Sequence, residues 1–459
     1  MRWHNVLAGI TTIFFASSVL ADKNYDAQID ALQNEILKIK QAQNTPDKNQ
    51  AYFKKGKGLS IESIDGKYSF QLKGRIMYDM AGVLSYERDD AGTVSDVAMD
   101  NGWGSEFRRL RFSIKGEVGD GWGFAFQPDF ADGGDDSSDR KVVFKDALIY
   151  KKWKGVGKFT FGNQKAAAGL YENTSSNNLI FMERPMHNEV MNFGHRAGIG
   201  YDSAGAFGPW HLKTTLFNGK ESAIEQNLSD GESGNETYGA SMATHYTHKV
   251  GDWSLLGGFH YGYWNVSNIN GTLDTPNGAR AQGVHTLVDK VVDFGNLTDL
   301  DSLQFFGPQM SVIWNKNLLV QAEYQKGQWD FTKTTGGLEH DALEFQGASI
   351  GAAYQVYGSG KFKHSAKKGA LSGFKCKSHC TMVKYQYEFI DATDQPYNSM
   401  YSENRGGSGQ AHTLGINHYF NSNVRLTAEY AHGNYGNDNT QSGADTTMNT
   451  MQLRLHLKY

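Results

Sequence analysis

Hydrophobic and polar positions alternate with a period of two from Tyr68 to the last residue, Tyr459. In residues 68–80 the even positions are apolar and most odd positions are polar, which is typical of a β-strand with one apolar face and one wetted face. Fifteen further runs show the pattern, at residues 107–118, 122–130, 142–151, 158–163, 196–202, 210–217, 237–249, 253–264, 304–314, 318–331, 343–357, 381–390, 411–420, 424–432 and 451–459. The alternation predicts sixteen strands.

The segments between these runs alternate in length. The connections at 119–121 and 421–423 are short, and the connection at 165–195 is long. Membrane barrels join their strands in this way, by long external loops and short periplasmic turns. Residues 358–380 should be short but are long, so we expect either an elaborated periplasmic turn or an error in the strand count beside it. We favour an all-β fold, a transmembrane antiparallel β-barrel of about sixteen strands, over a soluble β-sandwich with its wetted faces outside.

The chain before the barrel divides into three segments. Residues 1–21 combine an early basic residue, an apolar run and small residues at the end, which is the pattern of a cleavable signal peptide. Residues 22–45 have apolar side chains spaced by four and three positions, which predicts a short periplasmic coiled-coil helix. A solitary amphipathic helix is the alternative. We expect residues 46–67 to form a linker and residues 68–459 to form the barrel domain.

The balance of charges limits the partners of the protein. It has 45 basic and 49 acidic residues, with a formal net charge of −4. Since nucleic-acid-binding domains are normally strongly basic, we expect no nucleic acid partner. No stretch after the signal segment approaches the run of about 18 apolar residues that a membrane helix needs. We expect a barrel surrounded by outer-membrane lipid and lipopolysaccharide.

Local sequence motifs give a second line of evidence on the kind of protein. The segments that carry it are Phe107–Phe112 (FRRLRF), Val143–Ala147 (VFKDA), Phe159–Gln164 (FTFGNQ), Thr174–Asn178 (TSSNN), Phe181–Arg184 (FMER) and His412–Asn417 (HTLGIN). Together with the closing strand they resemble the phosphate-selective porin O and P family over nearly all of residues 68–459. The resemblance implies a homotrimeric sixteen-stranded porin in the outer membrane of a Gram-negative bacterium. It also implies an external loop that narrows the lumen, and residues 165–195 are at the position of this constriction loop.

The same resemblance bears on the solute. Members selective for phosphate bring a series of arginines and a cluster of loop lysines to the constriction, and Arg75, Arg108 and Arg109 resemble the upper part of that series. Residues 265–302 contain a single arginine, and residues 174–178 contain no lysine. We therefore expect a diffusion porin for small polar solutes and ions that is weakly anion-selective, with weak or absent block by phosphate. A channel selective for phosphate or polyphosphate is the alternative.

Closure of the barrel predicts the sign of the charge on the pore wall, independently of the family. The last strand pairs with the first, so the lumen-facing residues of the first two and last two strands form one wall. Basic residues outnumber acidic ones on this wall, and carboxylates on an opposite loop would set up a transverse field. The predicted pore-lining and anion-binding residues are Lys73, Arg75, Arg108, Arg109, Arg111, Lys115, Arg425 and Arg454 on the wall, with Glu183 and Arg184 on the loop. The alternative is that these charges only keep the lumen solvated.

The remaining candidates concern covalent and catalytic chemistry. Cys376 and Cys380 are close in sequence and in an oxidising compartment, so we expect a small disulfide, which stabilises less than a bridge across a long loop, in preference to a zinc site. The histidines have no metal-ligand spacing, and we expect no metal and no cofactor. No HExxH or P-loop motif is present, so we expect no enzyme. A barrel-borne outer-membrane enzyme or an adhesin is the alternative from another class.

Overall fold

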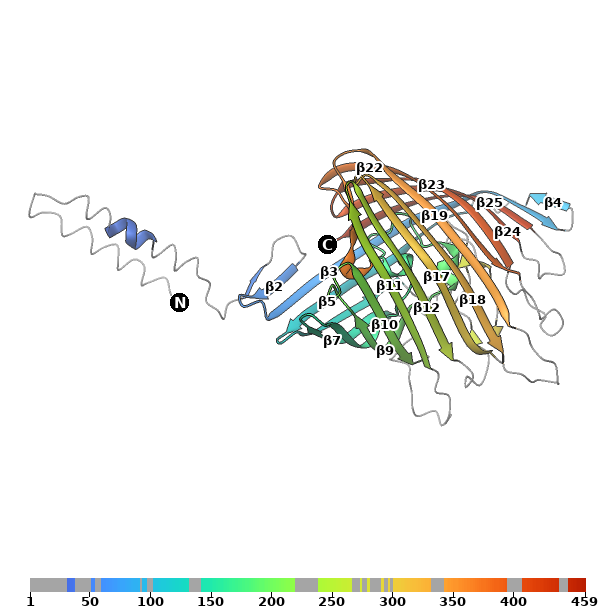
Figure 1. Ribbon diagram of the computed structural model, residues 1–459. Helices are drawn as coiled ribbons and strands as arrows, with labels where there is room; N and C mark the ends of the chain where they lie inside the picture. Colours follow the sequence, from blue (N-terminus) through green and yellow to red (C-terminus); the bar gives the residue numbers. More distant parts are fainter. Residues whose placement is uncertain are drawn as a thin grey trace, which may run out of the picture. The chain divides into compact units, whose positions relative to one another are not determined.

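The structure is a computed structural model, and Figure 1 shows it in ribbon form. It describes residues 31–37, 51–53, 59–90, 93–96, 102–131, 142–218, 238–265, 273–274, 279–280, 290–292, 296–297, 300–331, 342–393, 407–436 and 445–459. The expected signal peptide at residues 1–21 lies outside the described residues. Within the expected coiled-coil segment, residues 31–37 are helical and exposed, and they belong to a separate compact unit from the barrel.

Sixteen antiparallel strands form a closed ring, which confirms the predicted fold class and strand count. They are β3 (Tyr68–Asp90), β5 (Trp103–Val118), β6 (Trp122–Asp129), β7 (Val143–Trp153), β8 (Gly157–Lys165), β9 (His195–Asp202), β10 (Trp210–Asn218), β11 (Tyr238–Val250), β12 (Trp253–Asn265), β17 (Leu300–Trp314), β18 (Leu318–Phe331), β19 (Leu343–Tyr357), β22 (Ser378–Ala392), β23 (Gly407–Asn421), β24 (Val424–Gly436) and β25 (Asp445–Lys458). β25 pairs with β3 and closes the ring.

Shorter elements accompany the ring. β2 (Leu59–Ser63) pairs with the start of β3, and β4 (Thr93–Asp96) pairs with its end. The other short strands are β1 (Ala51–Phe53), β13 (Leu273–Asp274), β14 (Ala279–Arg280), β15 (Lys290–Val292) and β16 (Asn296–Leu297). Among the described residues, no helix is long and apolar enough to cross a membrane.

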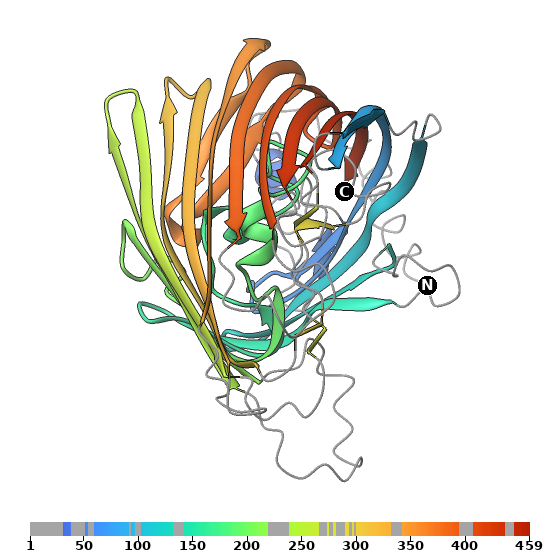
Figure 2. The ribbon, with the colours of Figure 1, turned by 90° about the vertical axis from the view of Figure 1, so that its right-hand side faces the viewer.

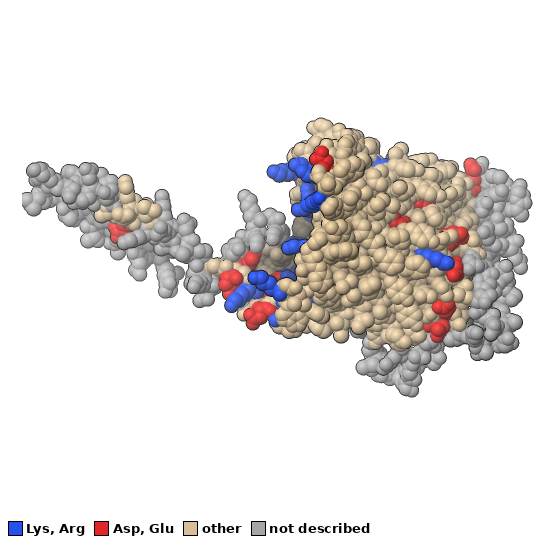
Figure 3. All heavy atoms as spheres, viewed as in Figure 1, with Lys and Arg blue, Asp and Glu red and all other residues tan. Residues whose placement is uncertain are grey.

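The two faces of the strands have opposite chemistry. Large apolar side chains, such as Leu216, Leu414 and Ile350, are more than half exposed on the outer face. Polar side chains on the inner face, such as Glu388 and Gln325, are fully buried. In Figure 3 the visible outer wall is almost free of charge, and the blue and red side chains gather near the two ends of the barrel. An apolar exterior around a polar interior is the arrangement that a bilayer requires.

A long segment between β8 and β9 lies inside the ring. It contains the short helices α3 (Leu170–Asn173) and α4 (Met186–Val190), drawn in green within the strands in Figure 2. We call residues 166–194 the constriction loop. Apolar side chains of its second half, including Met191 and Phe193, pack on a cluster of inner-wall aromatic residues. Because this burial is against the wall, the loop is a fixed part of the interior.

The connection at 358–380 proves to be an elaborated turn, so the strand count beside it was correct. It forms β20 (Lys361–Ser365), the 3-10 turn η1 (Ala366–Lys368) and β21 (Ala370–Lys375). We call these residues the inner hairpin, because its tip contacts the lumen side of β10 and β11 and accepts hydrogen bonds from the constriction loop. Gly369, just after η1, has a φ of 50°, a conformation that glycine adopts without the steric cost of a Cβ atom. The lumen therefore holds elements from both ends of the barrel.

Candidate pore constriction

Side chains of β17 and β18 hold the N-terminal end of the constriction loop. The backbone N–H of Leu170 donates to Oε1 of Gln309 at 2.8 Å, and the N–H of Tyr171 donates to Oε2 of Glu323 at 3.2 Å. These are groups at the start of a helix, where backbone N–H donors have no partner within the helix. Wall acceptors thus satisfy the start of α3.

The centre of the loop is held by an ionic cluster around Glu183. Its carboxylate accepts from both Nη atoms of Arg109, at 2.9 and 2.7 Å, and from Nη2 of Arg454 at 2.6 Å. Arg108 approaches the same carboxylate at 3.3 Å, and Arg454 also pairs with Asp79 at 2.5 Å. Glu183 is therefore in direct contact with the arginines of the wall, and does not face them across an open lumen as the expected transverse field required.

A β-bulge explains why two consecutive arginines reach one carboxylate. In the pairing of β3 with β5, Met77 is opposite Arg109 and Tyr78 is opposite Phe107, so Arg108 is an extra residue. A bulge of this kind breaks strict alternation and lets neighbouring side chains share a face. Arg108 and Arg109 consequently both point to the loop.

Backbone carbonyl groups of the loop bind cations from β22, β24 and β25. Arg425 donates to the carbonyl of Leu179 at 2.8 Å, and Lys384 donates to the carbonyl of Ile180 at 2.9 Å. Lys384 also forms a fully buried ion pair with Glu429. Arg454 donates to the carbonyl of Met182. These contacts use the charges of Arg425 and Arg454 to hold the loop.

The other predicted residues make different contacts. Arg75 donates to the hydroxyl of Ser176, at the turn that follows α3, and Arg111 pairs with Asp129 on β6. Lys115 is exposed on β5, and Lys73 is partly buried on β3. Arg184 is partly buried on the loop.

Arg184 and Lys165 enclose a loop carboxylate, Glu172. Nε of Arg184 and Nζ of Lys165 each approach it at 2.7 Å. Burial alone raises the pKa of Glu172, but these two cations outweigh burial and lower the pKa to about 2. Glu172 is thus ionised throughout the physiological range and fixes both cations.

Several lumen cations were missing from the predicted set, and three of them show why. Lys158 of β8 and Lys213 of β10 lie within electrostatic range of each other and of Asp202, and Lys384 of β22 binds the loop. All three occupy inward positions of predicted strands, so the period-two rule would have found them. The prediction missed them because it examined only the first two and last two strands.

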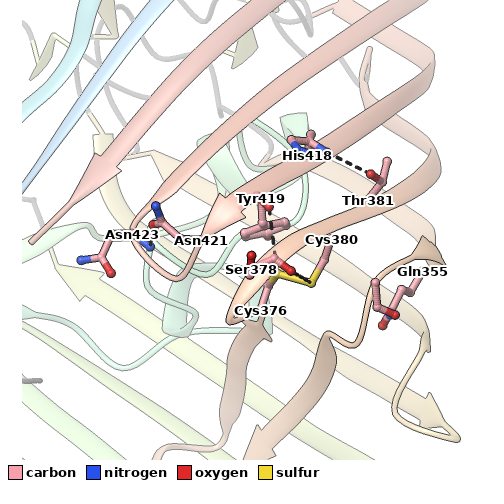
Figure 4. The surroundings of a disulfide bond; sticks show 10 residues. Gln355, Cys376, Ser378, Cys380, Thr381, His418, Tyr419, Asn421 and Asn423 are labelled. Atoms are coloured by element: carbon pink, nitrogen blue, oxygen red, sulfur yellow. Dashed lines mark hydrogen bonds between the residues drawn. A yellow bond between two sulfur atoms is a disulfide. The ribbon is translucent and has the colours of Figure 1, made fainter.

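Cys376 and Cys380 form a disulfide at the base of the inner hairpin, with an S–S distance of 2.08 Å. Figure 4 shows the bond beside Tyr419 of β23. Both cysteines are almost fully buried in an apolar cluster that also contains Phe374 of the hairpin and Phe181 of the constriction loop. The two inward elements therefore pack on each other next to the disulfide.

Comparison with known proteins places this interior in a family. Residues 70–459 match the family described as phosphate-selective porin O and P. The chain belongs to the phosphate-selective porin O and P family. A protein of Caulobacter vibrioides described as uncharacterized is 30% identical to this porin over 201 residues, which are 43% of this chain and 37% of the relative's length.

Two solved structures have the same fold at low sequence identity. The outer membrane channel DcaP of Acinetobacter baumannii is 12% identical, with a TM-score of 0.51, over 87% of this chain and 99% of that chain. OmpT, an outer membrane protein of Vibrio cholerae, is 13% identical, with a TM-score of 0.50, over 86% of this chain and 98% of that chain. The protein is an outer-membrane porin of a Gram-negative bacterium, as the sequence predicted.

Proposed function

We propose that this porin is a passive diffusion channel for small polar solutes and ions, with a weak preference for anions. The observation that carries the proposal is the cluster around Glu183. Three guanidinium groups, of Arg108, Arg109 and Arg454, share two carboxylates, of Asp79 and Glu183. The cluster therefore retains one positive charge. In a lumen where water is restricted, a surplus charge of this kind favours anions.

Further cations also support a net positive charge in the lumen. The only hydrogen bond described for the guanidinium of Arg75 is to a neutral hydroxyl, that of Ser176. Lys115 is exposed on the same wall as Arg75. A hydroxyl does not offset the charge of a bound guanidinium, whereas a carboxylate makes the pair neutral overall. We infer that Arg75 and Lys115 are the wall residues of the predicted set that contribute most to selectivity.

Phosphate selectivity is the second candidate, and the family name favours it. Several of the predicted anion-binding residues have other partners, however. Arg109 and Arg454 bind Glu183, Arg111 binds Asp129, and Arg425 binds a backbone carbonyl. Because these groups are engaged, we expect phosphate to block chloride current weakly.

Planar-bilayer recordings test the proposal. The purified porin should give an anion-directed reversal potential in a tenfold KCl gradient. The double variant Arg75→Gln/Lys115→Gln should shift this potential toward cations. Lys326→Gln is a matched control, since Lys326 lies on the outer face paired with Glu344, and it should leave the potential unchanged. Cation preference in the unmodified porin would overturn the proposal, and tight phosphate block would favour the second candidate.

We further propose that the porin is a homotrimer, with residues 1–21 as signal peptide, 22–45 as a coiled coil and 46–67 as linker. One side of the ring supports this assembly. β6 and β9 have 8 residues each, and β8 and β10 have 9, whereas β19, β22 and β23 have 15. Tilted strands of about 9 to 11 residues span a bilayer, so the short side is near or below this limit. A neighbouring protomer would shield the short side.

Deletion of residues 22–45 tests the coiled coil. The truncated porin should keep its single-channel conductance, because the segment belongs to a unit separate from the barrel. Its trimers should dissociate at a lower temperature in gel-shift assays. Equal heat resistance of the truncated trimer would remove the proposed role in assembly.

We infer no enzymatic activity. The described residues include one histidine whose two ring nitrogens both contact serines: His364, with Ser254 Oγ at 3.0 Å and Ser311 Oγ at 2.8 Å. Both ring nitrogens are therefore occupied by hydroxyls, and no position remains for the carboxylate that orients a catalytic histidine. His364 is also 3% exposed. This group is best explained as a contact between the inner hairpin and the wall.

A further inference from the structure

A chain of buried polar side chains crosses four neighbouring strands beneath the constriction loop. Nε2 of His245 on β11 is 2.9 Å from Nε2 of Gln309 on β17. Oε1 of Gln309 is 3.2 Å from Nδ1 of His260 on β12, and Nε2 of His260 is 2.8 Å from Nε2 of Gln325 on β18. We call these four residues the His–Gln chain. Each is at most 4% exposed.

The two glutamines of the chain bind opposite ends of the constriction loop. Oε1 of Gln309 accepts from the backbone N–H of Leu170 at 2.8 Å, and Nε2 of Gln325 donates to the backbone carbonyl of Met191 at 3.1 Å. A backbone N–H can only donate and a carbonyl can only accept. These loop contacts therefore fix the orientation of both side-chain amides.

The fixed orientation of the two glutamine amides determines which ring nitrogens of the histidines carry a proton. Nε2 of Gln309 must donate, so Nε2 of His245 must be an unprotonated acceptor. Oε1 of Gln309 must accept, so Nδ1 of His260 carries a proton. Nε2 of Gln325 must also donate, so Nε2 of His260 is unprotonated. The chain is complete only when both imidazoles are neutral.

We propose that the His–Gln chain is an acid-sensitive positioning device for the constriction loop. It rests on the proposed channel function and adds to it the residues that hold the loop and the condition that releases it. A proton from the lumen that binds Nε2 of His245 or His260 places an N–H group against the NH2 group of a glutamine. Rotation of either amide would place a donor against Leu170 N–H, or an acceptor against the Met191 carbonyl. Protonation therefore breaks a hydrogen bond of the chain, and it breaks a loop contact when a glutamine amide rotates to accept the new N–H group.

The charged groups around the two rings are of both signs. Lys213 and His211 of β10 lie near His245, and Glu323 of β18 and His187 of α4 lie near His260. Tyr171 and Asn188 donate to Glu323, which is also 3.8 Å from His187. The lysine opposes a charge on His245, whereas the carboxylate supports one on His260. We expect His260 to take up the first proton.

The experiment compares channel recordings at pH 7.0 and pH 4.5. In the unmodified porin, the rate of brief closures at pH 4.5 should exceed the rate at pH 7.0 on the order of tenfold, as for loss of one buried hydrogen bond. The double variant His245→Gln/His260→Gln cannot take up these protons, so its ratio of rates should be near one. His412→Gln is the control, because His412 lies on the outer face of β23, and it should behave as the unmodified porin.

A second variant tests the chemistry in the opposite direction. In Gln309→Glu a carboxylate accepts from Leu170 N–H, from His260 and from a protonated His245, so this variant should also lose the acid response. A merely structural role for Gln309 does not predict that result. Faster hydrogen exchange of loop residues 166–194 at pH 4.5, corrected for intrinsic rates, should accompany the closures in the unmodified porin and be absent from both variants.

The outcomes separate this inference from the proposed function. An acid response that persists in both variants, or that is absent from the unmodified porin, overturns the His–Gln chain as the device and leaves the channel intact. A protein that forms no channel at pH 7.0 refutes the proposed function instead.

Discussion

Glu183 is the residue whose replacement has the largest predicted effect. Its side chain is 4% exposed, and it contacts three guanidinium groups. In Glu183→Gln, Arg454 keeps Asp79, but Arg109 loses both of its carboxylate hydrogen bonds. Removing one partner from a buried ion pair costs about 3–5 kcal/mol, because the remaining charge is left uncompensated. The surplus charge of the cluster also rises from one to two.

Two measurements follow for this variant. Its unfolding free energy in detergent or lipid, measured by urea titration, should fall by about 3–5 kcal/mol. Its reversal potential should move further toward anions. Glu344→Gln is the matched control: Glu344 pairs with Lys326 on the outer face and is about half exposed, so the loss should be about 0–1 kcal/mol.

A double-mutant cycle between Glu183→Gln and Arg109→Gln would separate the pair from its surroundings. We expect a coupling energy above about 1 kcal/mol, since the two side chains share a buried bidentate contact. If Glu183→Gln were as stable as the unmodified porin and had the same selectivity, the view that this cluster both holds the loop and sets the sign of the pore would be refuted.

Three further predictions concern the interior. A left-handed alanine costs about 1–2 kcal/mol, and Gly369→Ala should destabilise the porin by more than this, because its Cβ would also meet buried histidine rings. Gly208 has a φ of 63° and open space around it, so Gly208→Ala should show the backbone cost alone in thermal melts. Glu172→Gln should have a constant stability deficit from pH 7 to pH 5 that shrinks as the pH falls from about 4.3 toward 2, because a depressed carboxyl pKa gives stability that is lost only in acid; a deficit that changed between pH 7 and pH 5 would contradict the ion pairing. Replacing Cys376 and Cys380 by alanine should cost about 2 kcal/mol, and by serine clearly more, because the serine hydroxyls would be buried in an apolar cluster; free thiols by mass spectrometry would remove the disulfide.

The alternation of side chains was sufficient to predict the barrel, because a strand between lipid and water must place alternate residues in each. It also delimited residues 165–195 as a long connection, and the family resemblance identified this connection as the constriction loop. The partners of charged residues were beyond this reasoning. Glu183 and Arg454 are 271 positions apart, and no local pattern indicates that they meet.

The inner hairpin shows a different limit. Residues 358–380 were recognised as anomalous, but their fold into the lumen depends on contacts with β10, β11 and the constriction loop, which are formed by distant parts of the chain. The buried histidines were dismissed for lack of metal spacing. Their partners prove to be glutamines, and a glutamine on the inner face of a strand gives no signal that distinguishes it from other polar lumen residues.

The closure of the ring by β25 and β3 imposes an order on biogenesis. Tyr459 exchanges backbone hydrogen bonds with Gly74, so the strand of the ring that comes last in the chain pairs with the strand that comes first. Arg454 then binds both Asp79 and the Met182 carbonyl. The constriction loop therefore cannot take its final shape in a nascent, open sheet. A chain truncated before its final strand would reach the periplasm as an unsealed intermediate, with its loop unanchored and its first strand an open edge for quality-control proteases.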